Sequence, residues 1–244
     1  MKTWLLRSPS ENDLIQVLQA WRIWLLATLI GALLGSVVYF LIPPNYRARA
    51  TVNVDQNLEQ AWPKAYTERD LMTYLARETQ KLVEVAWSDA TLQLIVDHNP
   101  YTSLSDLRSG VLQLSQPSDG AWHFWANDPD PQKAARLASD WAKAFYEQSL
   151  QGVVVATQIQ SLQESLLLSP SDAEAIKTQI KDLEPQSLGI SSYLQISLSQ
   201  SGEIPGERTS SPMSTILAGA ACAWILTLLG LLFLGSKNED HGNQ

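Results

Sequence analysis

The sequence has few of the residues from which catalytic and metal sites are usually built. It contains one cysteine, Cys222, and three histidines, scattered at positions 98, 123 and 241. A single cysteine excludes a disulfide within the chain, and no histidine has a second ligand at the spacing of zinc sites. Phosphate-loop, nucleophile-elbow and His-Glu-x-x-His patterns are also absent. The sequence therefore predicts a protein that is not an enzyme and that uses no metal and no cofactor.

Basic residues are too few and too dispersed for a nucleic-acid-binding surface. The chain has 17 Lys and Arg against 25 Asp and Glu, and its net charge is −8. The acidic excess lies between residues 45 and 211. Because phosphate contacts need clustered Lys and Arg, nucleic acid is not an expected partner.

Two stretches, residues 23–42 and 213–234, contain no charged side chain at all. A helix rises about 1.5 Å per residue, so about 20 apolar residues cross the hydrocarbon core of a bilayer, which is about 30 Å thick. Both stretches are therefore predicted to be transmembrane helices in contact with membrane lipid. Two spans place both termini on one side of the membrane and the intervening segment on the other.

This topology divides the chain into five expected segments. They are a cytoplasmic N-terminal segment with an amphipathic helix (1–22), a first transmembrane helix (23–42), an extracytoplasmic domain (43–212), a second transmembrane helix (213–234) and a short cytoplasmic tail (235–244). We place the domain outside because long loops are translocated largely regardless of charge. The alternative is a signal peptide cleaved before Thr51, but its apolar run would exceed the usual length of about 7–15 residues.

The segment between the two apolar stretches mixes strand and helix patterns. Apolar and polar residues alternate over Tyr46–Asp55 and over Tyr193–Gln200, which predicts a strand near each span. The elements expected between them are helices over 67–86, 90–98 and 103–108, a hairpin with strands over 111–115 and 121–126, a long helix over 132–168 and a return helix over 173–183. We therefore expect an α+β fold with a small mixed sheet and a protruding long-helix hairpin, the arm, over about residues 132–188.

Small residues recur at four-residue spacing in both apolar stretches. Gly31 and Gly35 form a Gly-x-x-x-Gly pattern in the first, and Gly219 and Ala223 form the equivalent pair in the second. Small residues let helices approach closely in lipid. The pattern predicts packing between the spans or between subunits, and the alternative is a chance occurrence in helices rich in glycine and alanine.

Tryptophan is frequent in the middle segment, and two tryptophans lie on the predicted strand 121–126. Because side chains alternate along a strand, Trp122 and Phe124 share one face, and His123 and Trp125 share the other. One of these faces packs into the core. The other tryptophan remains a candidate for contact with a glycan or a second subunit, with core packing the alternative for both.

Short motifs occur in a defined order along the chain. Pro43-Pro44-Asn45-Tyr46-Arg47-Ala48 leads from the first span into a strand, Asp128-Pro129-Asp130-Pro131 precedes the long helix, and Pro205 and Pro212 stand before the second span. The two aspartates are better explained as a turn and a helix cap than as glycosidase carboxylates. In this order and topology, the motifs resemble the polysaccharide co-polymerase family, the Wzz-type chain-length determinants.

The resemblance implies a function as well as a fold. It implies a ring-like homo-oligomer in the bacterial cytoplasmic (inner) membrane, acting with a polysaccharide polymerase or export machinery. Such a scaffold regulates the chain length or the export of a surface polysaccharide such as an O-antigen, a capsule or an exopolysaccharide. It does not imply catalysis by this chain.

Three other readings are open. The closest is a transmembrane adaptor that activates a separate bacterial tyrosine kinase in exopolysaccharide synthesis, although the short tail from Lys237 contains no tyrosine. A two-span sensor would need a cytoplasmic output module, which residues 235–244 are too short to supply. A hydrolase would need a nucleophile and a base, and no such pair stands out.

Overall fold

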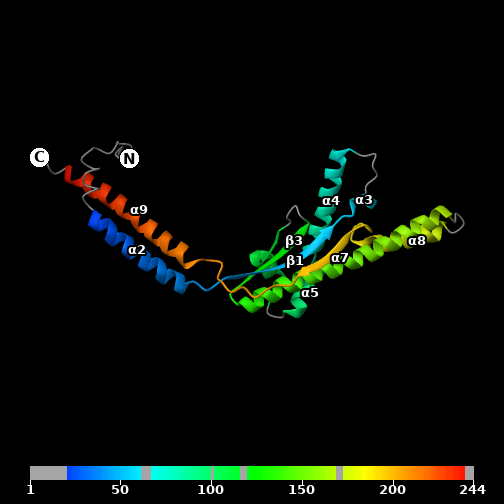
Figure 1. Cartoon of the computed structure of the whole chain (residues 1–244), viewed down its shortest axis with the longest axis horizontal. Coiled ribbons are helices and arrows are strands. Elements are labelled where there is room, and N and C mark those ends of the chain that lie inside the picture. The colour runs from blue at the N-terminus through cyan, green and yellow to red at the C-terminus, as the bar shows by residue number, and fades with distance from the viewer. Residues whose placement is uncertain (1–20, 62–66, 100–101, 116–119, 169–172, 240–244) are drawn as a thin grey trace. The chain divides into compact units, whose positions relative to one another are not determined.

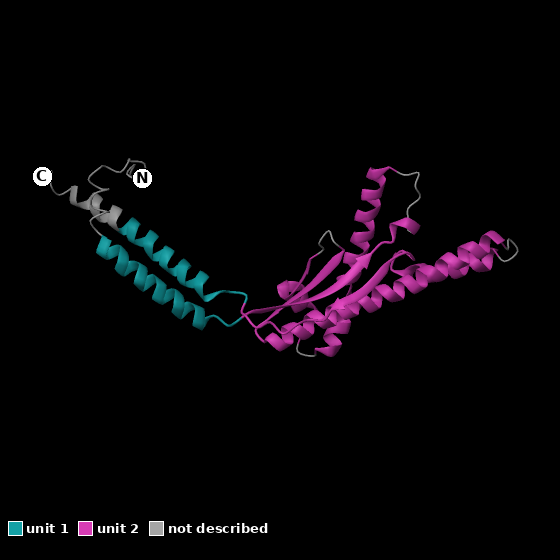
Figure 2. Cartoon of the chain, in the orientation of Figure 1, with its two compact units in different colours: residues 1–44, 209–244 teal, residues 45–208 magenta. Residues whose placement is uncertain are grey.

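The computed structural model describes residues 21–61, 67–99, 102–115, 120–168 and 173–239 (Figure 1). The amphipathic helix expected in 1–22 lies mostly outside the described residues, as do residues 116–119 between the two predicted hairpin strands and residues 169–172 between the predicted long helix and return helix. The chain divides into two compact units, one formed by residues 1–44 with 209–244 and the other by residues 45–208 (Figure 2).

Unit 1 is a pair of helices packed side by side, α2 (Trp21–Leu41) and α9 (Pro212–Glu239). Among the described residues, these two are long and apolar enough to cross a membrane, as judged from length and composition. Helix α2 ends just before Pro43-Pro44, because neither proline can donate the backbone hydrogen bond that would continue it. Helix α9 begins at Pro212, a position where the missing amide costs nothing.

Unit 2 is built on a four-stranded sheet in the order β2-β3-β1-β4. Its strands are β1 (Tyr46–Asp55), β2 (Leu112–Ser115), β3 (Ala121–Asp128) and β4 (Gln195–Gln200). Every described pairing is antiparallel, so the expectation of a mixed sheet was wrong. Strands β3 and β4 do run in the same direction, but β1 lies between them and runs the other way.

The helices of unit 2 follow the apolar periodicity of the sequence. They are α3 (Leu58–Ala61), α4 (Glu68–Ala86), α5 (Asp89–His98), α6 (Leu104–Asp106), the π-turn η2 (Leu107–Val111), α7 (Pro131–Leu168), α8 (Ala173–Leu183) and the 3₁₀ turn η4 (Glu184–Ser187). Side-chain caps begin several of them. Thr67 and Asp70 form a reciprocal capping box at α4, and Ser103 and Asp106 form another at α6.

Helix α7 runs unbroken from Pro131 to Leu168 and passes through Gly152. A Cβ atom at position 152 would lie 2.8 Å from Cδ1 of Ile190 and 2.9 Å from the carbonyl oxygen of Ser187. This glycine therefore serves close packing rather than bending. It lets the segment after α8 lie directly against α7.

The core of unit 2 lies between α7 and one face of the sheet, and aromatic rings fill much of it. Trp122 stacks on Phe145 with 5.6 Å between ring centroids, and Phe124 meets the edge of Trp141 at 4.9 Å. These rings come from β3 and α7. Such contacts add about 0.5–1.5 kcal/mol per pair to the burial of apolar area.

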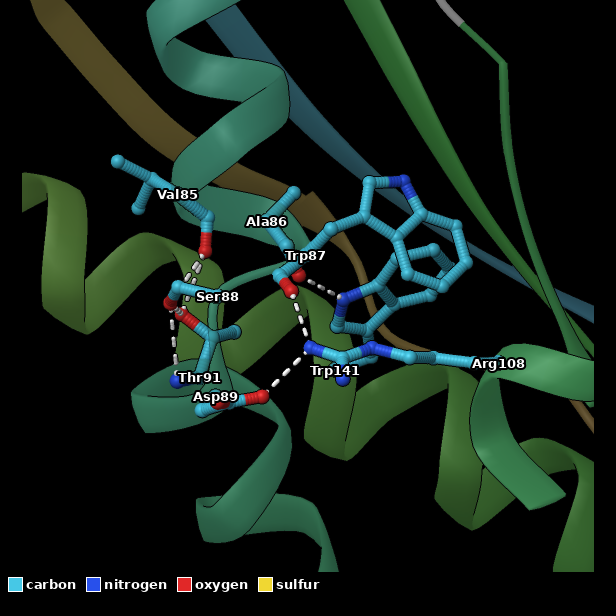
Figure 3. Close-up of polar contacts among 8 residues, drawn as sticks. All are labelled: Val85, Ala86, Trp87, Ser88, Asp89, Thr91, Arg108 and Trp141. Carbon is cyan, nitrogen blue, oxygen red and sulfur yellow. Dashed lines mark hydrogen bonds and ion pairs between the residues drawn. The ribbon is translucent and has the colours of Figure 1, made fainter. Parts of the chain in front are cut away.

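A polar corner fastens the α4–α5 turn to this core (Figure 3). The indole nitrogen of the fully buried Trp141 donates to the carbonyl oxygen of Ala86 at 2.8 Å. Arg108 donates to the carbonyl of Trp87 at 3.1 Å and to Asp89 at 2.6 Å. The corner joins α4, α5, η2 and α7, so it positions the helices that cover the sheet.

Candidate functional site

The small residues of unit 1 lie at the contact between its two helices. Gly31 and Gly35 are the described residues of α2 that are buried. A Cβ atom at Gly31 would lie 2.5 Å from both the Cβ of Ala223 and the carbonyl oxygen of Gly219, and one at Gly35 would lie 2.6 Å from the carbonyl oxygen of Thr215. A Cβ at Gly219 would collide with the carbonyl of Gly31. The backbones therefore approach as closely as a side-chain-free surface allows.

The outer surface of the helix pair is apolar, and its hydroxyl groups bond within their own helices. Leu29 and Leu33 of α2 are 68% and 66% exposed. Thr28, Ser36 and Thr227 donate to carbonyl oxygens four residues earlier, at 2.7, 2.9 and 2.8 Å. A hydrocarbon environment requires that polar groups be satisfied internally, and these are. These three hydroxyl groups would therefore need no water if the pair lay in a membrane.

In unit 2, the sheet has a core face and an open face. Trp122 is 4% exposed and points into the core, so it is not a surface available to a glycan or a subunit. Trp125, three residues later, lies on the open face with Arg47, Arg49 and His123. Alternation had predicted two opposite faces, but only packing against α7 decided which of them is buried.

The open face carries stacked cationic side chains. The guanidinium carbon of Arg47 lies 4.3 Å from the centroid of the Trp125 ring, and that of Arg49 lies 5.5 Å from it. Arg47 also donates to Oε1 of Gln113 at 2.6 Å. His123 meets Trp125 edge-on and shares a hydrogen bond of 3.1 Å with Thr51. These side chains come from three adjacent strands.

The Asp128-Pro129-Asp130-Pro131 motif forms the turn into α7. The backbone amide of Asp130 donates to Asp128 at 2.9 Å, and that of Gln132 donates to Asp130 at 2.8 Å. Lys133 pairs with Asp128 at 3.1 Å. Both carboxylates are thus engaged in the turn and the helix start. They support a structural interpretation of the motif.

The remaining motif positions flank the strands. The backbone of Tyr46, the first residue of β1, forms an isolated antiparallel bridge with Arg208. Pro43 and Pro44 precede β1, and Pro205 lies in the loop between β4 and Arg208. These prolines lack an amide donor and lie outside the described strands.

No group of three His, Cys, Asp or Glu side chains within the described ranges could hold a metal ion. An open groove of about 550 Å³ lies beside α7, with polar side chains that bond mainly to one another. There, Ser192 donates to Gln160 at 2.7 Å, and Gln160 donates to the hydroxyl of Tyr193 at 3.3 Å. Burial raises the pKa of the nearby Tyr74 phenol above its ordinary value. None of these groups forms a nucleophile–base pair.

Comparison with known proteins gives a family match at the N-terminal end. Residues 13–95 match the family model described as Wzz, chain length determinant protein. No curated protein matches the sequence. A solved structure described as a full-length bacterial polysaccharide co-polymerase is similar over 93% of this chain and 98% of that chain, with 11% sequence identity and a TM-score of 0.41.

The matched segment includes α2, β1, α4 and most of α5, and it contains the Pro43-to-Ala48 motif. The resemblance drawn from the sequence motifs is therefore confirmed. Residues 13–95, about a third of the chain, match the Wzz family of chain length determinants.

Proposed function

We propose that this chain is a non-enzymatic membrane scaffold that regulates the chain length or the export of a bacterial surface polysaccharide. Helices α2 and α9 span the cytoplasmic membrane, residues 43–212 lie outside it, and both termini lie in the cytoplasm. The family match over residues 13–95 carries the proposal. The apolar helix pair with internally bonded hydroxyls supports the membrane location.

A scaffold without catalytic groups acts by holding partners in place, and this requires assembly. We propose a ring-like homo-oligomer in which the sheet domains pack side by side and the α7–α8 arms associate. Strand β4 supports this, because it forms an edge of the described sheet and its Leu198 is 40% exposed to solvent. An exposed edge strand offers backbone groups to another chain.

The spans give the scaffold its contact with a polysaccharide polymerase or export machinery in the same membrane. Their glycine faces are occupied by each other, so partners would meet the outer surface, which is lined by leucines. We propose that the glycines hold the two spans in one fixed arrangement, and that this arrangement presents the outer surface to the polymerase or export partner.

The decisive experiment measures the size distribution of surface polysaccharide in a strain that lacks this chain, with and without its return. We expect a preferred length that disappears on deletion and is restored by the native gene. A Gly31→Leu/Gly35→Leu variant should fail to restore it, whereas Gly230→Leu should succeed, because a Cβ at position 230 meets nothing within 4 Å.

Other outcomes separate the alternatives. An unchanged distribution in normal amounts would overturn the proposal and favour the adaptor of a separate tyrosine kinase or a sensor. Co-purification of a kinase would support the adaptor. Complete loss of polymer on deletion, restored by the native gene, would support the export form of the scaffold.

A further inference from the structure

Arg47, Arg49 and Trp125 form a charged cluster on the open face of the sheet. The net charge of the chain is −8, yet two arginines stand two residues apart on one strand, on the same face. Within the described part of the chain, neither guanidinium forms an ion pair with a carboxylate. The next acid along β3, Asp128, is paired with Lys133.

The two arginines are held by stacking rather than by charge pairing. Arg47 lies over Trp125 at 4.3 Å and Arg49 at 5.5 Å. The covered Nε of Arg47 has no hydrogen-bond partner among the described residues. Stacking on an indole restrains a planar guanidinium while leaving most of its charge uncompensated. The cluster is therefore preorganised for an anion that approaches from the open face.

The position of the cluster along the chain indicates which anion this is. Arg47 follows Leu41, the last residue of α2, by six residues, and six extended residues reach at most about 20 Å. If α2 spans a bilayer, as proposed above, that tether keeps Arg47 within reach of the lipid headgroups. Headgroup phosphates suit arginine, which binds them with two parallel hydrogen bonds, and tryptophan is enriched at the same depth.

We propose that Arg47, Arg49 and Trp125 form a docking face for the phosphate groups of anionic membrane lipids. The attraction is electrostatic, so added salt weakens it. At 0.1 M ionic strength, it is screened beyond a Debye length of about 10 Å. The docking would restrain the sheet domain at the membrane surface. This inference rests on the proposed membrane location of α2.

The test uses the full chain in nanodiscs of phosphatidylcholine alone or with increasing phosphatidylglycerol. A trace of lipid with a spin-labelled headgroup quenches the fluorescence of tryptophans near the membrane surface. The fluorescence of Trp125 is obtained as the difference between the native chain and Trp125→Phe. We expect phosphatidylglycerol to increase quenching of Trp125. In Arg47→Gln/Arg49→Gln, the affinity for phosphatidylglycerol should fall by about 25-fold, at about fivefold per arginine, so quenching of Trp125 should stay near its level in phosphatidylcholine alone.

Arg69→Gln/Arg77→Gln is the matched control, because it removes the same charge from exposed positions on α4. It should leave quenching of Trp125 unchanged. Equal quenching with and without phosphatidylglycerol, or an equal loss in the control, would overturn the inference. Relief of quenching by soluble inorganic pyrophosphate at low concentration would also overturn the commitment to lipid and assign the cluster to a free phosphate compound.

Failure of the docking face can be distinguished from failure of the proposed membrane location. A chain that is extracted from membranes by alkali and fails to enter nanodiscs contradicts the membrane location itself. A chain that resists alkali and enters nanodiscs, but whose Trp125 ignores lipid charge, contradicts the docking face alone.

Discussion

The two units of this protein bury opposite kinds of residue. In unit 1, the closest contact between α2 and α9 is made by glycine and alanine, with the Trp24–Trp224 pair beside it, and leucines such as Leu29 and Leu33 face outward. In unit 2, α7 and the sheet enclose Trp141, Phe124 and Phe145, and among the described charged residues of this unit only Glu78 is buried. In water, burial of large apolar area drives packing, whereas in lipid that force is absent and close backbone contact replaces it.

Because of this difference, the two units should be sensitive to opposite kinds of substitution. Adding a side chain should damage unit 1, and removing one should damage unit 2. The experiments below use this contrast, starting with the change that the structure accommodates least.

Gly219→Leu should have the largest effect, because even a Cβ atom there collides with the carbonyl of Gly31 and lies 2.9 Å from Cα of Gly35. We expect α2 and α9 to separate. Trp24 and Trp224 lie 5.0 Å apart by ring centroids, so cross-linking of cysteines at these positions by a short bis-maleimide, in a Cys222→Ser background, reports the contact. Its yield should fall to background in Gly219→Leu and stay high in Gly230→Leu. Equal yields in both variants would contradict the glycine contact.

Trp141→Ala should have the next largest effect, with a loss of about 3–5 kcal/mol in the free energy of unfolding of unit 2. It empties the centre of the core and removes the donor to Ala86. Trp141→Phe should cost about 1–3 kcal/mol, since it leaves that carbonyl without its donor. Hydrogen exchange of the β1 and β3 amides in detergent measures both variants.

Trp125→Ala is the matched control for Trp141→Ala, because it removes the same side chain from the open face of the same sheet. It should cost about 1–2 kcal/mol, less than Trp141→Ala, because Trp125 is only partly buried and the main loss is its cation–π contacts with Arg47 and Arg49. A loss as large as that of Trp141→Ala would show that the open face is packed rather than available.

The smallest effect concerns the exposed capping box at α6. The hydroxyl and the amide of Ser103 donate to the Asp106 carboxylate, and these hydrogen bonds hold its pKa below the ordinary value. The lowered pKa in the folded chain means that the stabilisation is present above the ordinary pKa and is lost as pH falls through the lowered one. Ser103→Ala should raise the pKa of Asp106, as measured by carboxyl NMR. Ser109→Ala is the control, because that hydroxyl donates to the Asp106 backbone instead, and an equal rise there would contradict the assigned cause.

Local chemistry made much of the fold predictable. Strand β1 occupies Tyr46–Asp55 and helix α8 occupies Ala173–Leu183, as the alternation and the helical periodicity predicted. The amide of Gln132 bonds to Asp130, as a capping aspartate before Pro131 requires. Such features depend on neighbours within a few residues, so the sequence displays them. Helix α3 is a single turn, too short to show a period, and no pattern predicted it.

The candidate sites were less predictable, because they depend on residues far apart in the chain. The spacing of Trp122 and Trp125 on β3 predicted opposite faces but not which face α7 covers. No sequence pattern indicated that Arg47 and Arg49 stack on Trp125. Strand β1 is separated from β3 along the chain by several helices and strand β2. Trp141 lies within the predicted long helix, but nothing in the sequence indicated its hydrogen bond to Ala86.

The amino-acid sequence was enough to indicate the two apolar helices, the glycine pattern within them, the strand and helix periods between them and the motifs that resemble those of the Wzz family. These follow from composition and short-range spacing. The tertiary structure alone decided the antiparallel order of the sheet, the burial of Trp122 rather than Trp125 and the meeting of Gly31 with Gly219. The physical reason is that pairing and burial are decided by which distant segments can fill one another's surfaces.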